Sequence, residues 1–221
     1  MDERKLLIGV PSVRGGDKFL SSIYTFISSL KGFYEVSLLI EKCPGMAKAQ
    51  NRIAQYAIDN DFDYLLLCED DVYGHSKDML DALVKANAPV ASMQAYQRNF
   101  PYPNLLMVGD QGIEKESGYG EITLTGFHMC LIRKDVLKDL GMPYFIEEPS
   151  ECVAWDTSVN FFRRLKDLGI KVVGCWDFCL DNAGVTRQNV RELRERNAPP
   201  WIVRFMAQHP EIYGNLPLEA R

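Results

Sequence analysis

Three consecutive acidic residues follow directly on a short apolar run about a third of the way along the chain. The run, residues 63–68 (DYLLLC), is apolar enough to predict a strand that is covered on both faces. It leads without a turn residue into Glu69, Asp70 and Asp71. A strand of this kind requires a sheet with helices packed on both sides. This one segment therefore favours an α/β protein.

The segments around this strand alternate between short apolar runs and helical spacing. Strands are predicted over residues 6–10 (ended by Pro11), 36–40 and 89–93, and helices over 17–30 and 76–86. After the turn signal Pro44-Gly45, the residues Ala49, Ile53, Tyr56 and Ala57 recur at helical spacing. This order predicts a mostly parallel sheet with helices on both faces.

The second half of the chain is less regular. Residues 97–119 predict a loop with one hairpin, followed by strands over 121–125 and 128–132, a helix over 134–140, a helix from Asp156 to Leu168 and a strand over 171–175. The remaining residues, 187–221, form an arginine-rich segment. We expect one catalytic domain over residues 1–186, with residues 187–221 as a helical extension packed on it.

Composition excludes several classes of protein. A hydrophobic fraction of 47% is ample for a packed core, and a net charge of −5 argues against a surface that binds nucleic acid as a whole. No window is long enough to cross a bilayer, and the first apolar run is too short for a signal peptide. We therefore expect a cytoplasmic protein, with its six cysteines reduced and mostly buried.

The acidic cluster is the strongest indication of a functional site. Adjacent carboxylates repel one another unless a positive group lies between them, and Mg²⁺ or Mn²⁺ favours carboxylate oxygens. If the strand continues, Glu69 and Asp71 point to the same side and Asp70 points elsewhere. The alternative is a solvated acidic turn before the helix that begins near Ser76. The cluster alone leaves both interpretations open.

Five short stretches, in the same order, resemble the glycosyltransferase-A fold, particularly the family-two-like nucleotide-sugar transferases. They are residues 8–12 (IGVPS), 47–52 (AKAQNR), 65–72 (LLLCEDDV), 125–133 (TGFHMCLIR) and 155–169, which begins with Trp155-Asp156. The resemblance spans residues 5–184. It implies a metal-dependent transfer of a sugar from a nucleotide-diphosphate donor, with a UDP-sugar favoured, to an acceptor hydroxyl.

The resemblance also implies roles for particular residues. The donor would be bound by Pro11, Ser12, Arg14, Gln50, Arg52 and Asp70, and Mn²⁺ or Mg²⁺ by Glu69, Asp71, Asp181 and Asn182. Asp156 would be the catalytic base, and Gly126, His128 and Trp155 would lie on the acceptor side. The chain departs from the family pattern at Glu69, which replaces an aspartate, and at Asn182, which replaces a histidine. It also has Trp155-Asp156 in place of the family's acidic pair, with extra residues before Phe161.

Each assignment has an alternative. Asp156 is equally suited to cap its helix, Arg52 to be a solvated surface charge, and His128 to be a structural histidine. A nucleotidyltransferase or a catalytically silent nucleotide-sugar-binding protein would use the same sheet edge. The arginines of residues 187–204 pair in sequence with glutamates as on a solvated helix face, but they also allow an anionic acceptor such as modified DNA.

Overall fold

The computed structural model describes residues 3–12, 17–42, 45–97, 100–103, 106–108, 111–113, 117–147 and 157–182. Its helices are α1 (Asp17–Ser29), α2 (Met46–Asp59), α3 (Lys77–Lys85), α4 (Lys134–Leu140) and α5 (Thr157–Asp167). Its strands are β1 (Arg4–Ser12), β2 (Tyr34–Lys42), β3 (Tyr64–Cys68), β4 (Val72–Tyr73), β5 (Val90–Gln97), β6 (Phe100–Pro103), β7 (Leu106–Val108), β8 (Gln111–Ile113), β9 (Tyr119–Ile122), β10 (Met129–Arg133) and β11 (Val172–Asn182).

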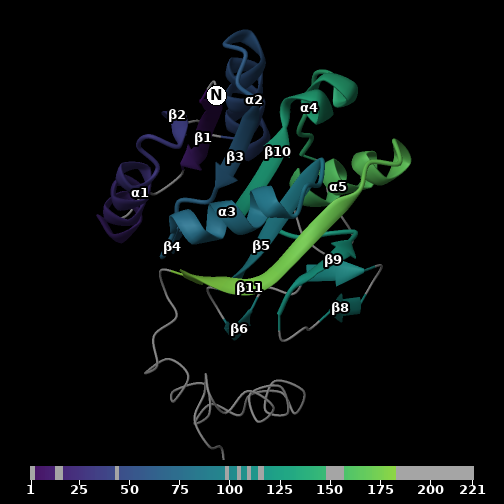
Figure 1. Cartoon of the computed structure of the whole chain (residues 1–221). Coiled ribbons are helices and arrows are strands. Elements are labelled where there is room, and N and C mark those ends of the chain that lie inside the picture. The colour runs from purple at the N-terminus through teal and green to yellow at the C-terminus, as the bar shows by residue number, and fades with distance from the viewer. Residues whose placement is uncertain are drawn as a thin grey trace, which may run out of the picture.

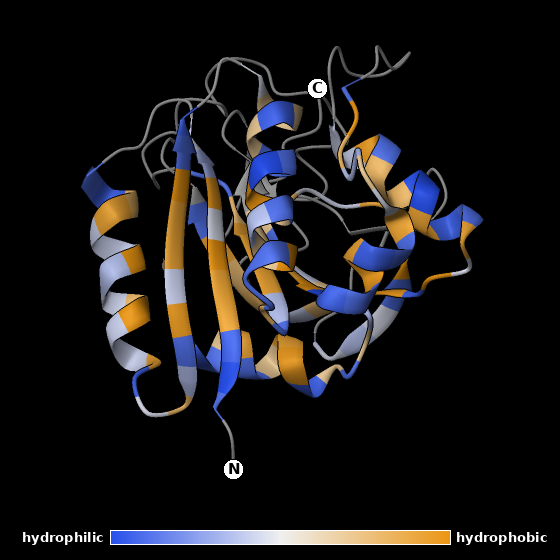
Figure 2. Ribbon diagram, turned by 90° about the horizontal axis from the view of Figure 1, so that it is seen from above, coloured by the Kyte–Doolittle hydropathy of each residue, from blue (hydrophilic) through white to orange (hydrophobic). Residues whose placement is uncertain are grey.

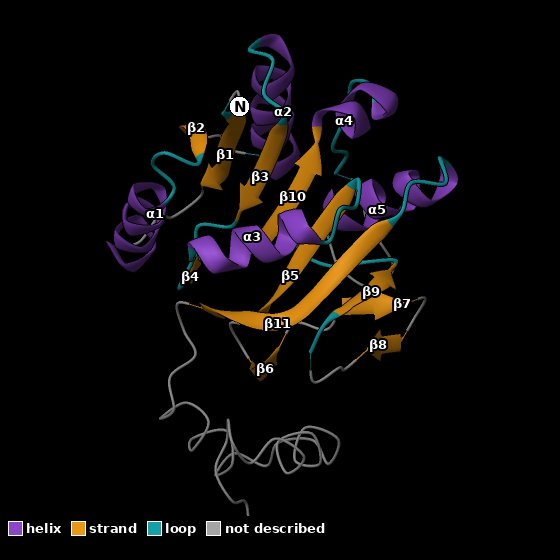
Figure 3. Cartoon of the chain, viewed as in Figure 1, coloured by secondary structure: helices purple, strands orange, loops and turns teal. Residues whose placement is uncertain are grey.

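The centre of the molecule is a nine-stranded sheet in the order β2-β1-β3-β10-β5-β11-β4, with β6 beside β5 and β9 beside β11 (Figure 1). Strands β2, β1 and β3 are parallel, β5 and β11 are parallel, and β10 runs antiparallel between β3 and β5. Figure 3 shows the helices lying against this sheet. The predicted α/β fold with a mostly parallel sheet is confirmed.

Alternating side chains of the central strands build two separate cores. In β3, Leu65 and Leu67 pack with α2, α4 and α5, whereas Leu66 and Cys68 pack with α1 and α3. Successive residues of a strand point to opposite faces, so an uninterrupted apolar run is what a doubly covered strand requires. Figure 2 shows the matching amphipathic pattern on the helices, where apolar and polar residues alternate along the ribbon.

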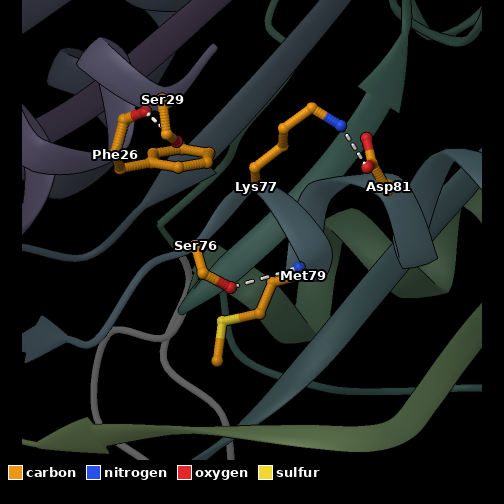
Figure 4. A network of polar contacts seen from close by, with 6 residues as sticks. All are labelled: Phe26, Ser29, Ser76, Lys77, Met79 and Asp81. Atoms are coloured by element: carbon orange, nitrogen blue, oxygen red, sulfur yellow. Dashed lines mark hydrogen bonds and ion pairs between the residues drawn. The ribbon is translucent and has the colours of Figure 1, made fainter.

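Polar contacts stabilise the first turns of α3, one of the helices that cover the sheet. At the start of α3 the hydroxyl of Ser76 accepts a hydrogen bond from the backbone N–H of Met79 at 3.3 Å. One turn later Lys77 pairs with Asp81 across the helix surface (Figure 4). A serine cap satisfies one of the free N–H groups of a first turn, which explains why the predicted helix begins here.

The close packing of α2 on β1 depends on a glycine. A Cβ atom built on Gly9 would lie 2.3 Å from Cγ2 of Ile53, so no larger residue fits while α2 keeps its position. Gly9 also lies beside Leu67 of β3 in the sheet register. The glycine therefore allows α2 to approach the strands that end at the acidic cluster.

Three details of the sequence interpretation were wrong. Pro11 does not end the first strand, because β1 continues beside β2 to Ser12 after its pairing with β3 has stopped at Gly9. A proline is tolerated there since one side of the strand has no ladder partner. Tyr56 is 42% exposed and does not face the core. The last predicted strand, residues 171–175, is part of the longer β11.

The four cysteines within the described residues, Cys68, Cys130, Cys175 and Cys179, are free thiols, and the first three are buried. Burial raises the pKa of the Cys130 thiol to about 12. These thiols are therefore protonated members of the core, as the sequence predicted. The arginine-rich segment 187–221 lies outside the described residues.

Candidate functional site

The carboxyl ends of β1 and β3 meet at one edge of the sheet. The two strands are parallel and in register from Leu6↔Tyr64 to Gly9↔Leu67. Just beyond this register the hydroxyl of Ser12 donates a hydrogen bond of 2.9 Å to Oδ2 of Asp70. The end of β1 and the acidic cluster are therefore in direct contact.

The first acid of the cluster is paired with a histidine that directly precedes the neighbouring strand β10. Nδ1 of His128 lies 2.5 Å from Oε2 of Glu69, and the backbone N–H of Phe127 also donates to this carboxylate. Burial of Glu69 raises its pKa, but the His128 charge and these hydrogen bonds outweigh burial and hold the pKa below its ordinary value. Glu69 is therefore an ionised carboxylate with fixed partners.

The third acid lies next to the end of β11. Asp71 directly precedes β4, and in the antiparallel pairing of β4 with β11 Val72 is opposite Asn182 and Tyr73 is opposite Asp181. Residues more than one hundred positions apart in the sequence are thus brought together. The structure places the backbone of the predicted Asp181-Asn182 pair beside the acidic cluster.

No group of three histidine, cysteine, aspartate or glutamate side chains gathers around a common point among the residues that the structure describes. The acids Glu69 and Asp70 instead contact two different segments, Glu69 the residue before β10 (His128) and Asp70 the last residue of β1 (Ser12). Mg²⁺ is commonly held by one or two carboxylates together with substrate phosphates. One or two acids of this cluster therefore fit such an ion only when a phosphate group completes its ligands.

Gln50 and Arg52, predicted together as donor ligands, differ in their surroundings. Gln50 is 2% exposed, and its Oε1 has no hydrogen-bond partner in the described structure. It lies on α2 one turn before Ile53, which packs on Gly9, and therefore near the carboxyl end of β1. Arg52 forms an ion pair of 2.6 Å with Glu41, with 55% of its side chain exposed.

On the predicted acceptor side, the ring of His128 lies directly over Gly126. A Cβ atom on Gly126 would be 2.7 Å from Nε2 and 2.9 Å from Cε1 of that ring. The segment between them is fixed by Phe127, whose ring lies 5.3 Å from Phe161 and 5.4 Å from Phe145. The remaining predicted site residues, Arg14, Trp155 and Asp156, lie outside the described residues.

One group of site-supporting residues was not recognised in the sequence. The side chain of Asn51 makes four hydrogen bonds, donating to the carbonyls of Ala47 and Phe145 (2.8 and 2.7 Å) and accepting from the N–H groups of Tyr144 and Phe145 (2.7 and 3.1 Å). Oε1 of Glu147 accepts from the N–H of Met46 at the start of α2. Asn51 is half-buried on α2 directly after the buried Gln50, and this pair of polar residues among the apolar positions of the helix was the available signal.

Beside the site, a buried histidine supports the turn that follows the acidic cluster. His75 is 6% exposed, and its Nδ1 lies 3.1 Å from the hydroxyl oxygen of Ser22. The same oxygen accepts the N–H groups of Gly74 and His75, at 2.9 and 3.1 Å. Burial lowers the pKa of His75 to about 4. The native protein therefore holds this imidazole neutral.

This histidine predicts a loss of stability in acid. Between pH 6.5 and 4 the imidazole is protonated in the unfolded state but not in the folded state. The contribution of the neutral His75 to the free energy of unfolding is therefore complete above pH 6.5 and decreases as the pH falls. Between pH 7 and 4.5 the wild type is expected to lose about 2.5 kcal/mol of unfolding free energy more than His75→Phe. Urea unfolding of both proteins at the two pH values measures this difference, and identical pH dependence would contradict it.

Comparison with known proteins identifies the fold. No family model and no curated protein matches the chain by sequence. Among solved structures it is similar to protein A197 from STIV, with 19% identity, a TM-score of 0.57 and coverage of 77% of this chain and 81% of that one. It is also similar to a proposed nucleotide-diphospho-sugar transferase from Desulfovibrio desulfuricans G20, with 9% identity, a TM-score of 0.52 and coverage of 98% and 100%.

A third similar structure is CMP:2-keto-3-deoxy-manno-octonic acid synthetase complexed with CTP, with 13% identity, a TM-score of 0.50 and coverage of 90% and 100%. At these identities the similarity shows the fold and not the activity. The fold is glycosyltransferase-A-like, as the sequence motifs indicated. None of the helices in the described ranges is both long and apolar enough to span a membrane.

Proposed function

We propose that this chain is a glycosyltransferase that takes its sugar from a nucleotide-diphosphate donor. The observation that carries the proposal is the hydrogen bond between Ser12 and Asp70, which joins the end of β1 to the acidic cluster. Ligands of open α/β sheets bind beyond the carboxyl ends of the strands, where this contact lies. Two similar structures are named for nucleotide-sugar transfer and for a complex with CTP, which supports a nucleotide ligand at this edge.

The donor would lie across the ends of β1 and β3. Pro11 and Ser12 are the last residues of β1, and Arg14 follows them in the sequence. Asp70 would accept a hydrogen bond from the ribose or the sugar. Gln50 offers a buried acceptor that lacks a partner, and such an atom costs stability unless a ligand or water supplies a donor. A base N–H group would satisfy it. Uracil, thymine and guanine all have such a group, so this atom does not select the base, and we favour a UDP-sugar because the resemblance of the sequence motifs implies it.

Mg²⁺ or Mn²⁺ would be held by Asp71 together with the donor diphosphate, with Asp181 and Asn182 next to it. When bound, the ion would neutralise charge on the diphosphate leaving group. Asp156, which directly precedes α5 in the sequence, would accept the proton of the acceptor hydroxyl. In this role its carboxylate would remove the proton as the new glycosidic bond forms.

A nucleotidyltransferase is the second candidate, favoured by the similarity to the synthetase complexed with CTP. Both enzymes bind a nucleotide at the same edge of the sheet. They differ in the bond that breaks: a glycosyltransferase releases a nucleoside diphosphate, whereas a nucleotidyltransferase releases pyrophosphate. The products therefore separate the two functions.

We expect the purified protein, incubated with Mn²⁺ and a panel of UDP-, GDP- and TDP-sugars, to bind one donor and slowly release its nucleoside diphosphate. Calorimetry measures binding, and chromatography identifies the product. Sugar transfer to glycans and to DNA with modified bases tests the acceptor class. Pyrophosphate release from nucleoside triphosphates would support the second candidate. Binding without turnover would support a silent binding protein, and no binding of any nucleotide would contradict the proposal.

A further inference from the structure

A groove lies between helix α1 and the turn that joins β4 to α3, two elements that are neighbours in Figure 1. Its volume is about 620 Å³, within the range of about 300–1,000 Å³ that is typical of small-molecule sites. None of its lining residues is among those proposed to bind the donor or the metal ion. They are Asp17, Lys18, Ser21, Ser22, Thr25, Tyr73, Gly74 and His75.

One wall of the groove is held in place by a single hydroxyl group. The oxygen of Ser22 accepts the backbone N–H groups of Gly74 and His75, at 2.9 and 3.1 Å, and lies 3.1 Å from Nδ1 of His75. Because both lone pairs of this oxygen are used, its own hydrogen is donated to Nδ1. The buried imidazole also packs against the rings of Phe19 and Phe26. The groove is therefore pre-formed, as ligand sites usually are.

The lining of the groove combines an aromatic ring with hydrogen-bond donors and acceptors. Nζ of Lys18 lies 5.5 Å from the centroid of the Tyr73 ring, so the ammonium and the ring are neighbours. Ser21 and Thr25 are exposed one turn apart on α1, and the Thr25 hydroxyl donates to the Ser21 carbonyl at 2.9 Å while its oxygen can still accept. Asp17 adds a carboxylate at the start of the helix.

These groups fit a neutral sugar better than an anion. Sugar hydroxyls both donate and accept, and the C–H groups of a sugar ring pack against the apolar face of an aromatic ring. Among the described lining residues, the charge of Lys18 is balanced by that of Asp17. A further carboxylate lies behind the turn, since a Cβ atom on Gly74 would be 3.9 Å from Oδ2 of Asp181. Nucleic acids instead bind where several cations neutralise phosphates.

The groove is next to the edge of the sheet where the donor is proposed to bind. Tyr73 belongs to β4, which directly follows Asp71, and it is opposite Asp181 in the pairing of β4 with β11. Burial raises the pKa of Asp181, and the nearby charge of Lys18 opposes this rise. The wall formed by Tyr73 and Gly74 is therefore a neighbour of the proposed metal site.

We infer that this groove binds a neutral oligosaccharide, and that this oligosaccharide is the acceptor, held through sugar units beyond the one that receives the transferred sugar. The groove supplies affinity and orientation, and no bond forms or breaks in it. Its identity as an acceptor site rests on the proposed function, whereas its binding of an oligosaccharide does not. The inference favours a glycan over modified DNA as the acceptor class.

The first experiment measures binding to the full chain by calorimetry, without a donor. The neutral probes are maltotetraose, cellotetraose, mannotetraose and N-acetylchitotetraose, and single-stranded DNA is the charged probe. One neutral probe should bind, and Ser21→Tyr, which places a ring in the groove, should lower its affinity at least about tenfold. The matched control is Ser28→Tyr, an exposed position of α1 outside the groove, where the hydroxyl donates to the Tyr24 carbonyl at 2.8 Å. The control should retain the wild-type affinity.

A second variant removes a contact without filling the groove. Lys18→Met should lower the affinity at least about fivefold, because hydrogen bonds from a charged group are lost. Lys31→Met, an exposed lysine beyond the end of α1, is its control. Urea midpoints show that each variant is folded. No binding of any neutral probe, or unchanged affinity in both Ser21→Tyr and Lys18→Met, would overturn the inference. DNA binding that Ser21→Tyr abolishes would overturn the assignment to a neutral sugar.

The second experiment tests whether the bound oligosaccharide is the acceptor. Ser21→Tyr should leave the slow release of nucleoside diphosphate from the donor unchanged. It should lower kcat/KM for transfer to the bound tetrasaccharide at least about tenfold, through KM, and not for transfer to the corresponding monosaccharide. Equal kcat/KM for the tetrasaccharide in the wild type and Ser21→Tyr would overturn the acceptor role.

The two experiments separate this inference from the proposed function. If the wild type binds no nucleotide, the proposed function fails, and the acceptor role is overturned with it. Oligosaccharide binding that is lost in Ser21→Tyr and kept in Ser28→Tyr would then still establish the groove as a sugar site. If the wild type releases nucleoside diphosphate from a donor but binds no oligosaccharide, the proposed function is supported and the inference about the groove is overturned.

Discussion

Asp71→Asn is expected to remove most of the Mn²⁺-dependent affinity for a nucleotide-diphosphate donor. Among the three acids, Glu69 is bound by His128 and Asp70 by Ser12, and Asp71 lies nearest in sequence to the β4–β11 pairing that brings in Asp181. Asparagine keeps the size of the side chain and removes its charge. Since loss of even an outer-shell partner lowers metal affinity about 10- to 100-fold, loss of the ligand should cost at least as much.

The measurement is UDP binding by calorimetry, with Mn²⁺ and with a chelator, for the wild type and Asp71→Asn. Asp139→Asn removes an exposed acid from α4 and serves as the control for a change in net charge. In the chelator, the wild type and Asp71→Asn should bind UDP with the same weak affinity, because the substitution removes only the metal-dependent part of the affinity. Unchanged Mn²⁺-dependent affinity in Asp71→Asn would count against a metal-assisted site at this edge.

Asn51→Ala is expected to lower the unfolding free energy by about 3 kcal/mol, because it leaves several backbone groups without partners. The amide of Asn51 satisfies both N–H groups of Tyr144 and Phe145 and the carbonyl of Phe145, at distances of 2.7 to 3.1 Å. For a chain of this size the loss corresponds to a decrease in Tm of about 6–12 °C.

Thermal unfolding followed by circular dichroism measures the change, and hydrogen exchange at Tyr144 and Phe145 locates it. The matched control is Asn60→Ala, which also removes an asparagine that donates to a carbonyl of α2, that of Tyr56 at 2.9 Å, but from an exposed position. The control should change stability by less than about 0.5 kcal/mol. Equal effects of the two substitutions would show that the Asn51 contacts do not support the fold.

The layered fold was predictable because its signals are local. The apolar run of β3 could be covered only on both faces, and the alternation of runs and helical spacing fixed the order of the elements. The helices α1 and α4 were predicted within one residue of their observed ends. The boundaries of β1 and β11 were not predicted correctly. A strand continues only as long as a neighbouring strand pairs with it, and that neighbour is distant in the sequence.

The site was predictable in part for the same reason. The acids follow β3, and parallel strands end at a common edge, so the approach of Ser12 to Asp70 follows from the order of elements. The pairing of Glu69 with His128 did not follow from it. It depends on β10 inserting antiparallel beside β3, a choice that the sequence pattern of residues 128–132 does not contain.

The sequence by itself thus determined which residues form strands and helices, and that three carboxylates lie at the edge of a doubly covered sheet. Only the tertiary structure decided which partner each carboxylate has, and that Asn51 and Arg164 bind the segment before α5. The physical reason is the separation in sequence of the residues that interact. Helical spacing and strand alternation are properties of adjacent residues, whereas a hydrogen bond between strands depends on register, which is set by the packing of the whole sheet.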